Sequence, residues 1–246
     1  TEEMEASADS LDLTGELTGV PAHILVNELR DSVVLITEEG FLHHYQNDPD
    51  ARRMVLAYPA QNVFDAQADR DRGWSWRESI NDQRDGQGFA PMPGRLAVTD
   101  VDYLLGDDTI LIGDSGGGIQ SWLTLLEEDP AAGRVWRRYA RVRSLPPSPG
   151  AIVDVTASPI TKAALITDDA GNVRAINNTA ERVYLEVQQE GVNRAVFNRK
   201  GDGFLAVNDA GKIFHYWGDE PHGEVSLKAL FGGVWYESYP GRKYEW

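Results

Sequence analysis

Cysteine is absent from the sequence, so the chain has no disulfide, no thiolate nucleophile and no cysteine-based metal site. Long apolar runs are absent too: the longest, Met54 to Tyr58, is far shorter than the roughly 20 residues that a membrane-spanning helix needs. Basic residues are few, with 23 Lys and Arg against 39 Asp and Glu and a formal net charge of −16. A field of that sign repels phosphate backbones and anionic lipid headgroups. We therefore expect neither nucleic-acid binding nor direct membrane insertion of this chain.

The 246 residues suffice for one large domain or two small ones with a real hydrophobic core. Apolar residues make up 41% of the chain and charged residues 25%, which is the composition of a folded protein. The sequence begins at Thr1 without a visible signal peptide, and we expect it to be cut from a longer protein.

Four segments of the chain share one pattern, in which a short β-rich run is followed by acidic or amide residues and then by glycine. The segments are residues 33–40, 110–117, 164–171 and 204–211. An aliphatic residue follows each glycine at the second position, and a large apolar residue follows at the fifth. This pattern predicts a strand, a tight turn with a positive-φ glycine, and a second strand. The predicted turn glycines are Gly40, Gly117, Gly171 and Gly211.

Each predicted hairpin has a further β-rich run on either side. The upstream runs are residues 24–26, 96–98, 152–155 and 195–197, and the downstream runs are residues 54–58, 136–142, 182–187 and 225–230. The turn glycines are 77, 54 and 40 residues apart, which indicates a four-stranded unit of about 40 residues with insertions, as is typical of β-propeller blades. We therefore predict an all-β, β-propeller-like fold of the WD-repeat kind with about four blades. The sequence leaves open whether these blades form a complete propeller.

The organisation along the chain follows from these units. We expect a propeller-like domain over residues 1–226 and a connector over residues 227–246. Residues 62–94 are polar, highly charged and poor in strand-forming residues, which favours an inserted loop over a decayed blade. Trp74 and Trp76 lie in this insert beside arginines. They are the candidate partner interface if exposed, and a lid on the core if they fold back.

One motif resembles a catalytic signature. Residues 113–117 read Gly-Asp-Ser-Gly-Gly, the nucleophile signature of trypsin-like serine proteases, with Ser115 in the nucleophile position. Catalysis would need a histidine base held by an aspartate. The candidate, His23, lacks the cysteine that follows the histidine in that family, and Ser115 lies before the midpoint of the chain rather than late in it. The motif also coincides with a turn of the repeat. We therefore predict a structural turn, no catalytic residue and no enzyme activity.

Metal and cofactor sites are not indicated either. His44 and His215 occupy equivalent positions, each directly before a tyrosine. Because alternate side chains of a strand point to opposite faces, we expect these histidines to face solvent. No pair of histidines has metal-ligand spacing, so we predict no metal and no cofactor. Arginines 137, 138, 141 and 143 could bind phosphate locally. On one strand they alternate in pairs, and solvent-facing charge is the simpler interpretation.

The end of the chain breaks the blade pattern and carries a family resemblance. Residues 227–240 read Leu-Lys-Ala-Leu-Phe-Gly-Gly-Val-Trp-Tyr-Glu-Ser-Tyr-Pro, and Tyr-Glu-Trp closes the chain at 244–246. This stretch resembles the segment that leads into the main transmembrane block of long-form PstC-type permeases, the phosphate importers of the ABC transporter class.

The resemblance implies that the chain is the extracytoplasmic (periplasmic) insert of an inner-membrane permease. Its implied partners are the remaining permease and other importer subunits, including the phosphate-binding protein. Because the chain carries a net charge of −16, a regulatory or docking role suits it better than phosphate capture. Two alternatives stay open: a free-standing β-propeller scaffold for protein interaction, and a propeller enzyme or lectin.

Overall fold

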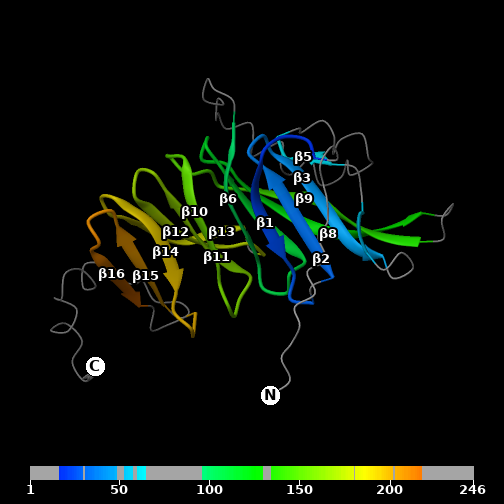
Figure 1. Cartoon of the computed structure of the whole chain (residues 1–246). Coiled ribbons are helices and arrows are strands. Elements are labelled where there is room, and N and C mark those ends of the chain that lie inside the picture. The colour runs from blue at the N-terminus through cyan, green and yellow to red at the C-terminus, as the bar shows by residue number, and fades with distance from the viewer. Residues whose placement is uncertain are drawn as a thin grey trace, which may run out of the picture.

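The structure is a computed structural model, and it describes residues 17–29, 31–48, 53–57, 60–64, 96–129, 134–179, 181–201 and 203–217. The described residues form β-strands and no helix, and the strands make four antiparallel sheets (Figure 1). The predicted all-β fold is therefore confirmed. No helix in the described ranges is long and apolar enough to cross a membrane.

Each sheet is one blade, and its strands follow one another in chain order. Blade 1 contains β1 (Pro21–Val26), β2 (Ser32–Thr37), β3 (Phe41–Asp48) and β4 (Arg53–Leu56), and β5 (Gln61–Asn62) also pairs with β3. Blade 2 contains β6 (Val98–Tyr103), β7 (Thr109–Asp114), β8 (Ile119–Asp129) and β9 (Arg134–Leu145). Blade 3 contains β10 (Ile152–Ala157), β11 (Ala163–Asp168), β12 (Asn172–Asn177) and β13 (Arg182–Gln188). Blade 4 contains β14 (Val192–Phe197), β15 (Gly203–Asn208) and β16 (Ile213–Trp217).

The four predicted glycine turns are confirmed. Each glycine has a positive φ, between 75° and 84°, and lies between the second and third strands of its blade. Its N–H donates a hydrogen bond to the carbonyl oxygen three residues earlier, at 2.8 to 3.1 Å. The local pattern alone predicts this feature, because the turn needs a residue that tolerates positive φ.

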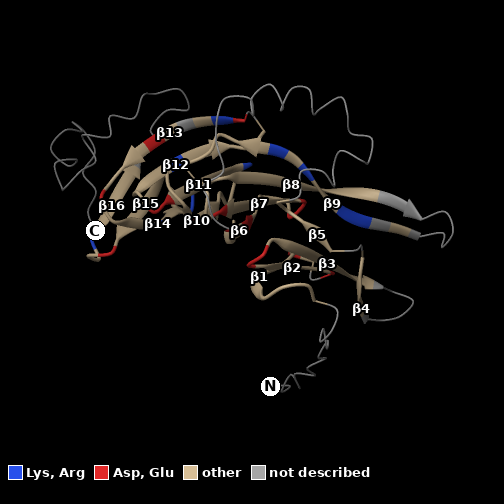
Figure 2. Ribbon diagram, turned by 90° about the horizontal axis from the view of Figure 1, so that it is seen from above, with Lys and Arg blue, Asp and Glu red and all other residues tan. Residues whose placement is uncertain are grey.

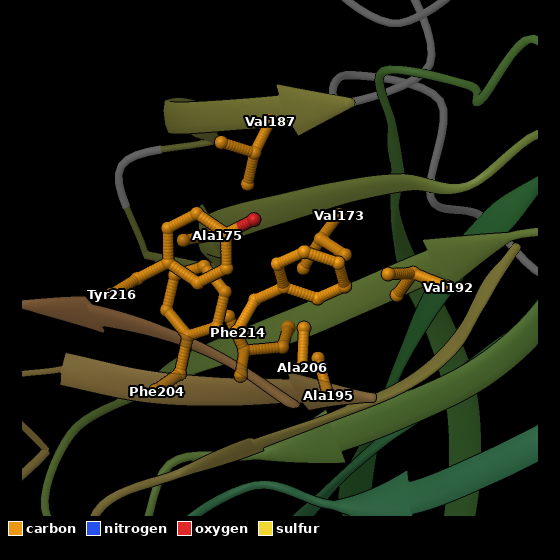
Figure 3. Packing of buried hydrophobic residues seen from close by; sticks show 10 residues of the cluster. Val173, Ala175, Val187, Val192, Ala195, Phe204, Ala206, Phe214 and Tyr216 are labelled. Carbon is orange, nitrogen blue, oxygen red and sulfur yellow. The ribbon is translucent and has the colours of Figure 1, made fainter. Parts of the chain in front are cut away.

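The blades pack face to face and lie along an arc, with blade 1 at one end and blade 4 at the other (Figures 1 and 2). One apolar cluster fills each junction between neighbouring blades. The cluster between blades 3 and 4 includes Val173 and Val187 on one side and Phe204, Phe214 and Tyr216 on the other (Figure 3). Phe204 and Tyr216 stack with ring centroids 4.5 Å apart, a geometry that adds to their burial.

Both faces of an inner blade therefore lie in the core. In β7, Ile110 and Ile112 belong to the cluster with blade 1, and Leu111 belongs to the cluster with blade 3. All three side chains are fully buried, which explains why this strand is an uninterrupted apolar run instead of an alternating one.

The predicted insert over residues 62–94 begins three residues too early. Asn62 pairs with Phe41 across the β3–β5 ladder, Val63 is buried, and Phe64 packs against the cluster between blades 1 and 2. These residues belong to blade 1. Residues 65–94, the predicted strand over residues 225–230 and the predicted connector lie outside the described residues.

Candidate functional site

Ser115, the candidate nucleophile of the protease-like motif, is part of a structural turn. Its Oγ accepts a hydrogen bond from the backbone N–H of Ala97 at 3.0 Å, and its own N–H donates to the carbonyl of Ala97 at 2.9 Å. Asp114 is buried, and its Oδ1 accepts the N–H groups of Gly116 and Gly118 at 2.8 and 2.9 Å. The motif thus ties the turn after β7 to the segment that enters β6.

The same turn recurs in all four blades. The last residue of the second strand accepts, through its side-chain oxygen, the N–H of the residue four positions later. The accepting residues are Thr37, Asp114, Asp168 and Asn208, with distances of 2.9 to 3.1 Å. The next residue donates its N–H to a carbonyl just before or at the start of the blade's first strand, as Ser115 does. Repetition at every blade explains the Asp-Ser-Gly sequence as turn chemistry.

Ser115 should therefore show no hydrolytic reactivity. We expect a serine-directed fluorophosphonate probe to leave the whole chain unlabelled at Ser115, because that hydroxyl already serves the backbone. Mass spectrometry of the treated protein measures this, with trypsin as the positive control. Stoichiometric labelling of Ser115 would show that the hydroxyl is an activated nucleophile and would contradict the structural assignment.

Asp168 is the most heavily engaged of the turn carboxylates. Its Oδ2 accepts from the Ser148 hydroxyl at 2.7 Å, and its Oδ1 accepts the backbone N–H groups of Ala170 and Asn172. Burial opposes ionisation, but these hydrogen bonds outweigh it and hold the pKa of Asp168 below its ordinary value. The carboxylate is thus occupied in joining strands.

The expectation that His44 faces solvent is wrong. His44 lies in β3 and is buried between blades 1 and 2, and His43 beside it is buried on the opposite face; His215 is half-buried. The Nε2 of His44 lies 2.7 Å from the Ser32 hydroxyl, and its Nδ1 lies 2.8 Å from the carbonyl oxygen of Arg137. Since a carbonyl only accepts, Nδ1 carries a proton. In the neutral ring Nε2 accepts from the Ser32 hydroxyl.

Burial is the main reason for this neutral state. Loss of water around the ring lowers the pKa of His44 to about 4. Its edge packs on Tyr139, with centroids 4.9 Å apart, and the Tyr139 hydroxyl lies 3.2 Å from that of Tyr103. His44 thus forms a polar contact within the apolar junction of blades 1 and 2, and links β3 to β9.

Carboxylates on the first strands of the blades also connect neighbouring blades. Asp100 accepts the N–H of Val155 and Asp102 accepts that of Ala157, both at 2.7 Å, so that β6 is tied to β10. Asp154 accepts the N–H of Ala195 at 3.2 Å in the next blade. Burial raises the pKa values of Asp102 and Asp154. These groups act as inter-blade acceptors and not as a free acid–base pair.

The arginines of β9 do not converge on one phosphate site. Cross-strand pairing puts Arg137 and Arg141 on the face toward blade 1, opposite Leu126 and Trp122. Arg138 is buried on the other face, which also carries Arg143. The arginines thus lie in pairs on two faces, but the expectation that they face solvent is wrong for the buried Arg138. Arg143 forms an ion pair with Glu181 of the neighbouring blade at 2.7 Å, and this contact lies toward blade 3.

The β8–β9 hairpin forms the most distinctive exposed surface among the described residues. Strands β8 and β9 have 11 and 12 residues, whereas no other strand in the described residues has more than eight. Both strands extend past the rest of the blade (Figures 1 and 2). Near the body, Trp122 and Tyr139 are covered by blade 1. Farther out on the same face, Leu126 is 73% exposed and Val135 is 56% exposed. We refer to Leu126, Val135 and Arg137 as the hairpin surface.

Sequence reasoning missed the hairpin surface, although a signal was present. The β-rich runs at residues 119–128 and 134–145 are much longer than the corresponding runs of the other repeat units. Trp74 and Trp76, the candidate interface named from sequence, lie outside the described residues. Within the described ranges, no group of three or more His, Cys, Asp or Glu is arranged to hold a metal ion.

Comparison with known proteins gives a fold and no family. No protein-family model and no curated protein sequence matches the chain. Among solved structures, the chain is similar to the crystal structure of the C-terminal WD40 domain of Sif2, with a TM-score of 0.52 and 13% identity. The match covers 83% of this chain and 50% of that chain, so the chain spans about half the length of the WD40 structure it resembles. The predicted propeller-like blades are confirmed by this similarity.

Proposed function

We propose that the chain is a non-catalytic protein-docking scaffold whose partner binds the hairpin surface. The observation that carries this proposal is the exposure of Leu126 and Val135 on one face of a hairpin that extends past its blade. The WD40-like fold supports a scaffold role by analogy. The turn geometry of Ser115 supports the absence of hydrolytic chemistry.

The chemistry of the hairpin surface indicates the kind of partner. Leu126 lies directly opposite Arg137, and Val135 is diagonal to Leu126 on the same face. The surface thus offers two apolar side chains beside an exposed guanidinium, which stacks well on aromatic rings. The net charge of −16 attracts basic proteins over longer distances. We therefore propose a basic partner that docks through an aromatic-containing segment.

The hairpin is held firmly enough to present such a surface. The backbone N–H of Arg137 donates to the side-chain oxygen of Gln46 at 3.3 Å, and its carbonyl accepts from His44 at 2.8 Å. Both contacts anchor β9 to β3 next to the exposed residues. A surface fixed in this way loses little conformational entropy on binding.

Selection from a phage-displayed random peptide library tests the proposal. We expect the whole chain to enrich basic peptides that contain aromatic residues. Their affinity should fall at least about 10-fold with Leu126→Asp or Val135→Asp, because a charge replaces an apolar contact. Leu29→Asp is the matched control, since Leu29 is an equally exposed leucine in a turn of blade 1. Enriched peptides that bind all variants equally would contradict the assignment of the site.

We further propose that the partner belongs to a phosphate importer of the inner membrane, with this domain on its extracytoplasmic side. The support is the resemblance of residues 227–246 to the PstC-type connector. That segment lies outside the described residues. The acidic net charge supports a docking or regulatory role beside the remaining permease and the phosphate-binding protein, and not capture of phosphate.

Calorimetric titration with inorganic phosphate tests the second part of this proposal. We expect no measurable heat from the whole chain, since the arginines of β9 point to two different faces. A dissociation constant of about 10 μM or tighter, roughly 7 kcal/mol of binding free energy, would show that the domain captures substrate. Binding of the purified importer subunits to the chain, and its loss with Leu126→Asp, would connect both proposals.

A further inference from the structure

The outer face of blade 4 carries apolar residues of the kind that the junctions between blades bury. In the part of the chain that the structure describes, no blade packs on this face. The residue six positions before the turn glycine is fully buried against the next blade in blades 1, 2 and 3, where it is Val34, Leu111 and Leu165. In blade 4 this residue is Leu205, and it is 39% exposed.

A second repeat position gives the same result independently. The residue two positions after the turn glycine is Leu42, Ile119 or Val173 in the first three blades, and each is fully buried in the junction with the next blade. The equivalent residue of blade 4, Ile213, is 66% exposed. Val207 lies directly opposite Ile213 across β15 and β16, and both lie on the face that carries Leu205. We call Leu205, Val207 and Ile213 the trailing face.

The other end of the arc has the complementary feature. In blades 2, 3 and 4, one residue of the first strand is buried against the preceding blade: Val101, Val155 and Ala195. Each of these residues pairs with the residue two positions before the end of the second strand. The residue of blade 1 that pairs in this way is Ile24, which is 67% exposed. Val26, two residues later on the same face, is also exposed, whereas Leu35, His43 and Tyr45 on the neighbouring strands of this face are buried. The open part of the face is therefore its β1 strand, and we call Ile24 and Val26 the leading face.

We propose that two copies of this chain associate end to end, with the trailing face of each copy packed on the leading face of the other. Each of the three junctions within the chain joins a trailing face to a leading face, so along β1 the proposed contact repeats an interface that this sequence makes. Two equal contacts related by a two-fold axis close a ring and leave neither face exposed. The ring would have eight blades, within the range found for propellers.

Two observations favour a second copy as the occupant. The four blades match half of the WD40 structure, so a second set of four supplies the other half of a ring of that size. Both faces also carry the residue types that the internal junctions bury, which makes them complementary to each other by repeat position. The net charge of −16 per copy opposes association, so we expect added salt to strengthen the dimer.

Sedimentation equilibrium of the whole chain at several concentrations tests the proposal. We expect a single species of twice the 27.2 kDa of one chain, and no larger assembly, because the ring is closed. Ile213→Asp should weaken dimerisation at least about 100-fold, and so should Ile24→Asp, since each places a charge in both contacts. Ile160→Asp is the matched control, because Ile160 is an exposed isoleucine between β10 and β11 of blade 3 and belongs to neither face.

Mixing the two variants gives the sharpest result. One of the two contacts in the mixed pair joins an unchanged trailing face to an unchanged leading face, so the mixture should regain a dimer that neither variant forms alone. Circular dichroism and thermal unfolding check that both variants fold. A chain that stays monomeric at all concentrations would overturn the proposal and leave these faces to a different protein. A dimer that only one of the variants disrupts would overturn it as well, because it would use one face twice.

Discussion

Replacing Gly171 with alanine is expected to lower the free energy of unfolding by about 3 kcal/mol. Gly171 has a φ of +80°, which costs an alanine about 1 to 2 kcal/mol. A Cβ at this position would also collide with the backbone carbonyl oxygen of Gln189. Because this atom belongs to the backbone, no side-chain rotation can relieve the collision. That carbonyl belongs to the segment that links blade 3 to blade 4, and forcing it outward adds about 1 to 3 kcal/mol.

Gly211 provides the control for this prediction. It occupies the same turn position in blade 4 with a φ of +75°, but a Cβ there would meet no atom within 4 Å. Gly211→Ala should therefore cost only the conformational part, about 1 kcal/mol. Urea denaturation of both variants measures the difference. Equal losses of stability would mean that Gln189 does not restrict this turn.

The second large effect is a loss of stability in mild acid that depends on His44. The pKa of His44 falls from about 6.5 in the unfolded chain to about 4 in the folded one. Because the folded pKa is the lower one, the unfolded state binds the proton first. The contribution is therefore fully present above pH 6.5 and is lost progressively as the pH falls toward 4. The total is about 3 kcal/mol.

His44→Gln isolates this effect, since glutamine keeps a polar group between the strands but does not titrate. Urea unfolding at pH 7.5, 6, 5 and 4.5 should show a shallower pH dependence for the variant than for the wild type. His43, whose pKa burial also lowers, leaves some dependence in the same direction. The raised pKa values of Asp102 and Asp154 act in the opposite direction, because the folded state then binds the proton first. Identical pH profiles would show that His44 is not held neutral by the fold.

The hairpins could be predicted from sequence because their signals are local. The turn at Gly171 needs a positive φ, and Asp168 three residues earlier provides the acceptor, so both appear in the sequence at fixed spacing. Because the same turn pattern recurs in the other units, the protease-like motif around Ser115 could be identified as a turn instead of a catalytic site. The strands of blades 1 and 3 followed from the β-rich runs on either side. The first strand of blade 2 lies at Val98–Tyr103 and shares only Val98 with the run predicted at residues 96–98.

The position of His44 could not be predicted in this way. Alternation along a strand indicates which side chains share a face, but not whether water or another sheet covers that face. Blade 2 covers the face that carries His44, and the opposite face of blade 1 is buried at Tyr45 as well, although no described blade lies there. The same non-local packing determines that Ile213 is exposed and Leu42 is buried, although the two occupy equivalent positions in the repeat.

Hydrogen–deuterium exchange of the whole chain, with and without a selected peptide, tests most directly whether the chain functions as a docking scaffold. The docking account predicts slower exchange on peptide binding in residues 124–128 and 134–138, the outer part of the β8–β9 hairpin. The same peptide should give no such protection in the Leu126→Asp variant. Protection confined to other parts of the chain, or protection that persists unchanged in the variant, would contradict the account.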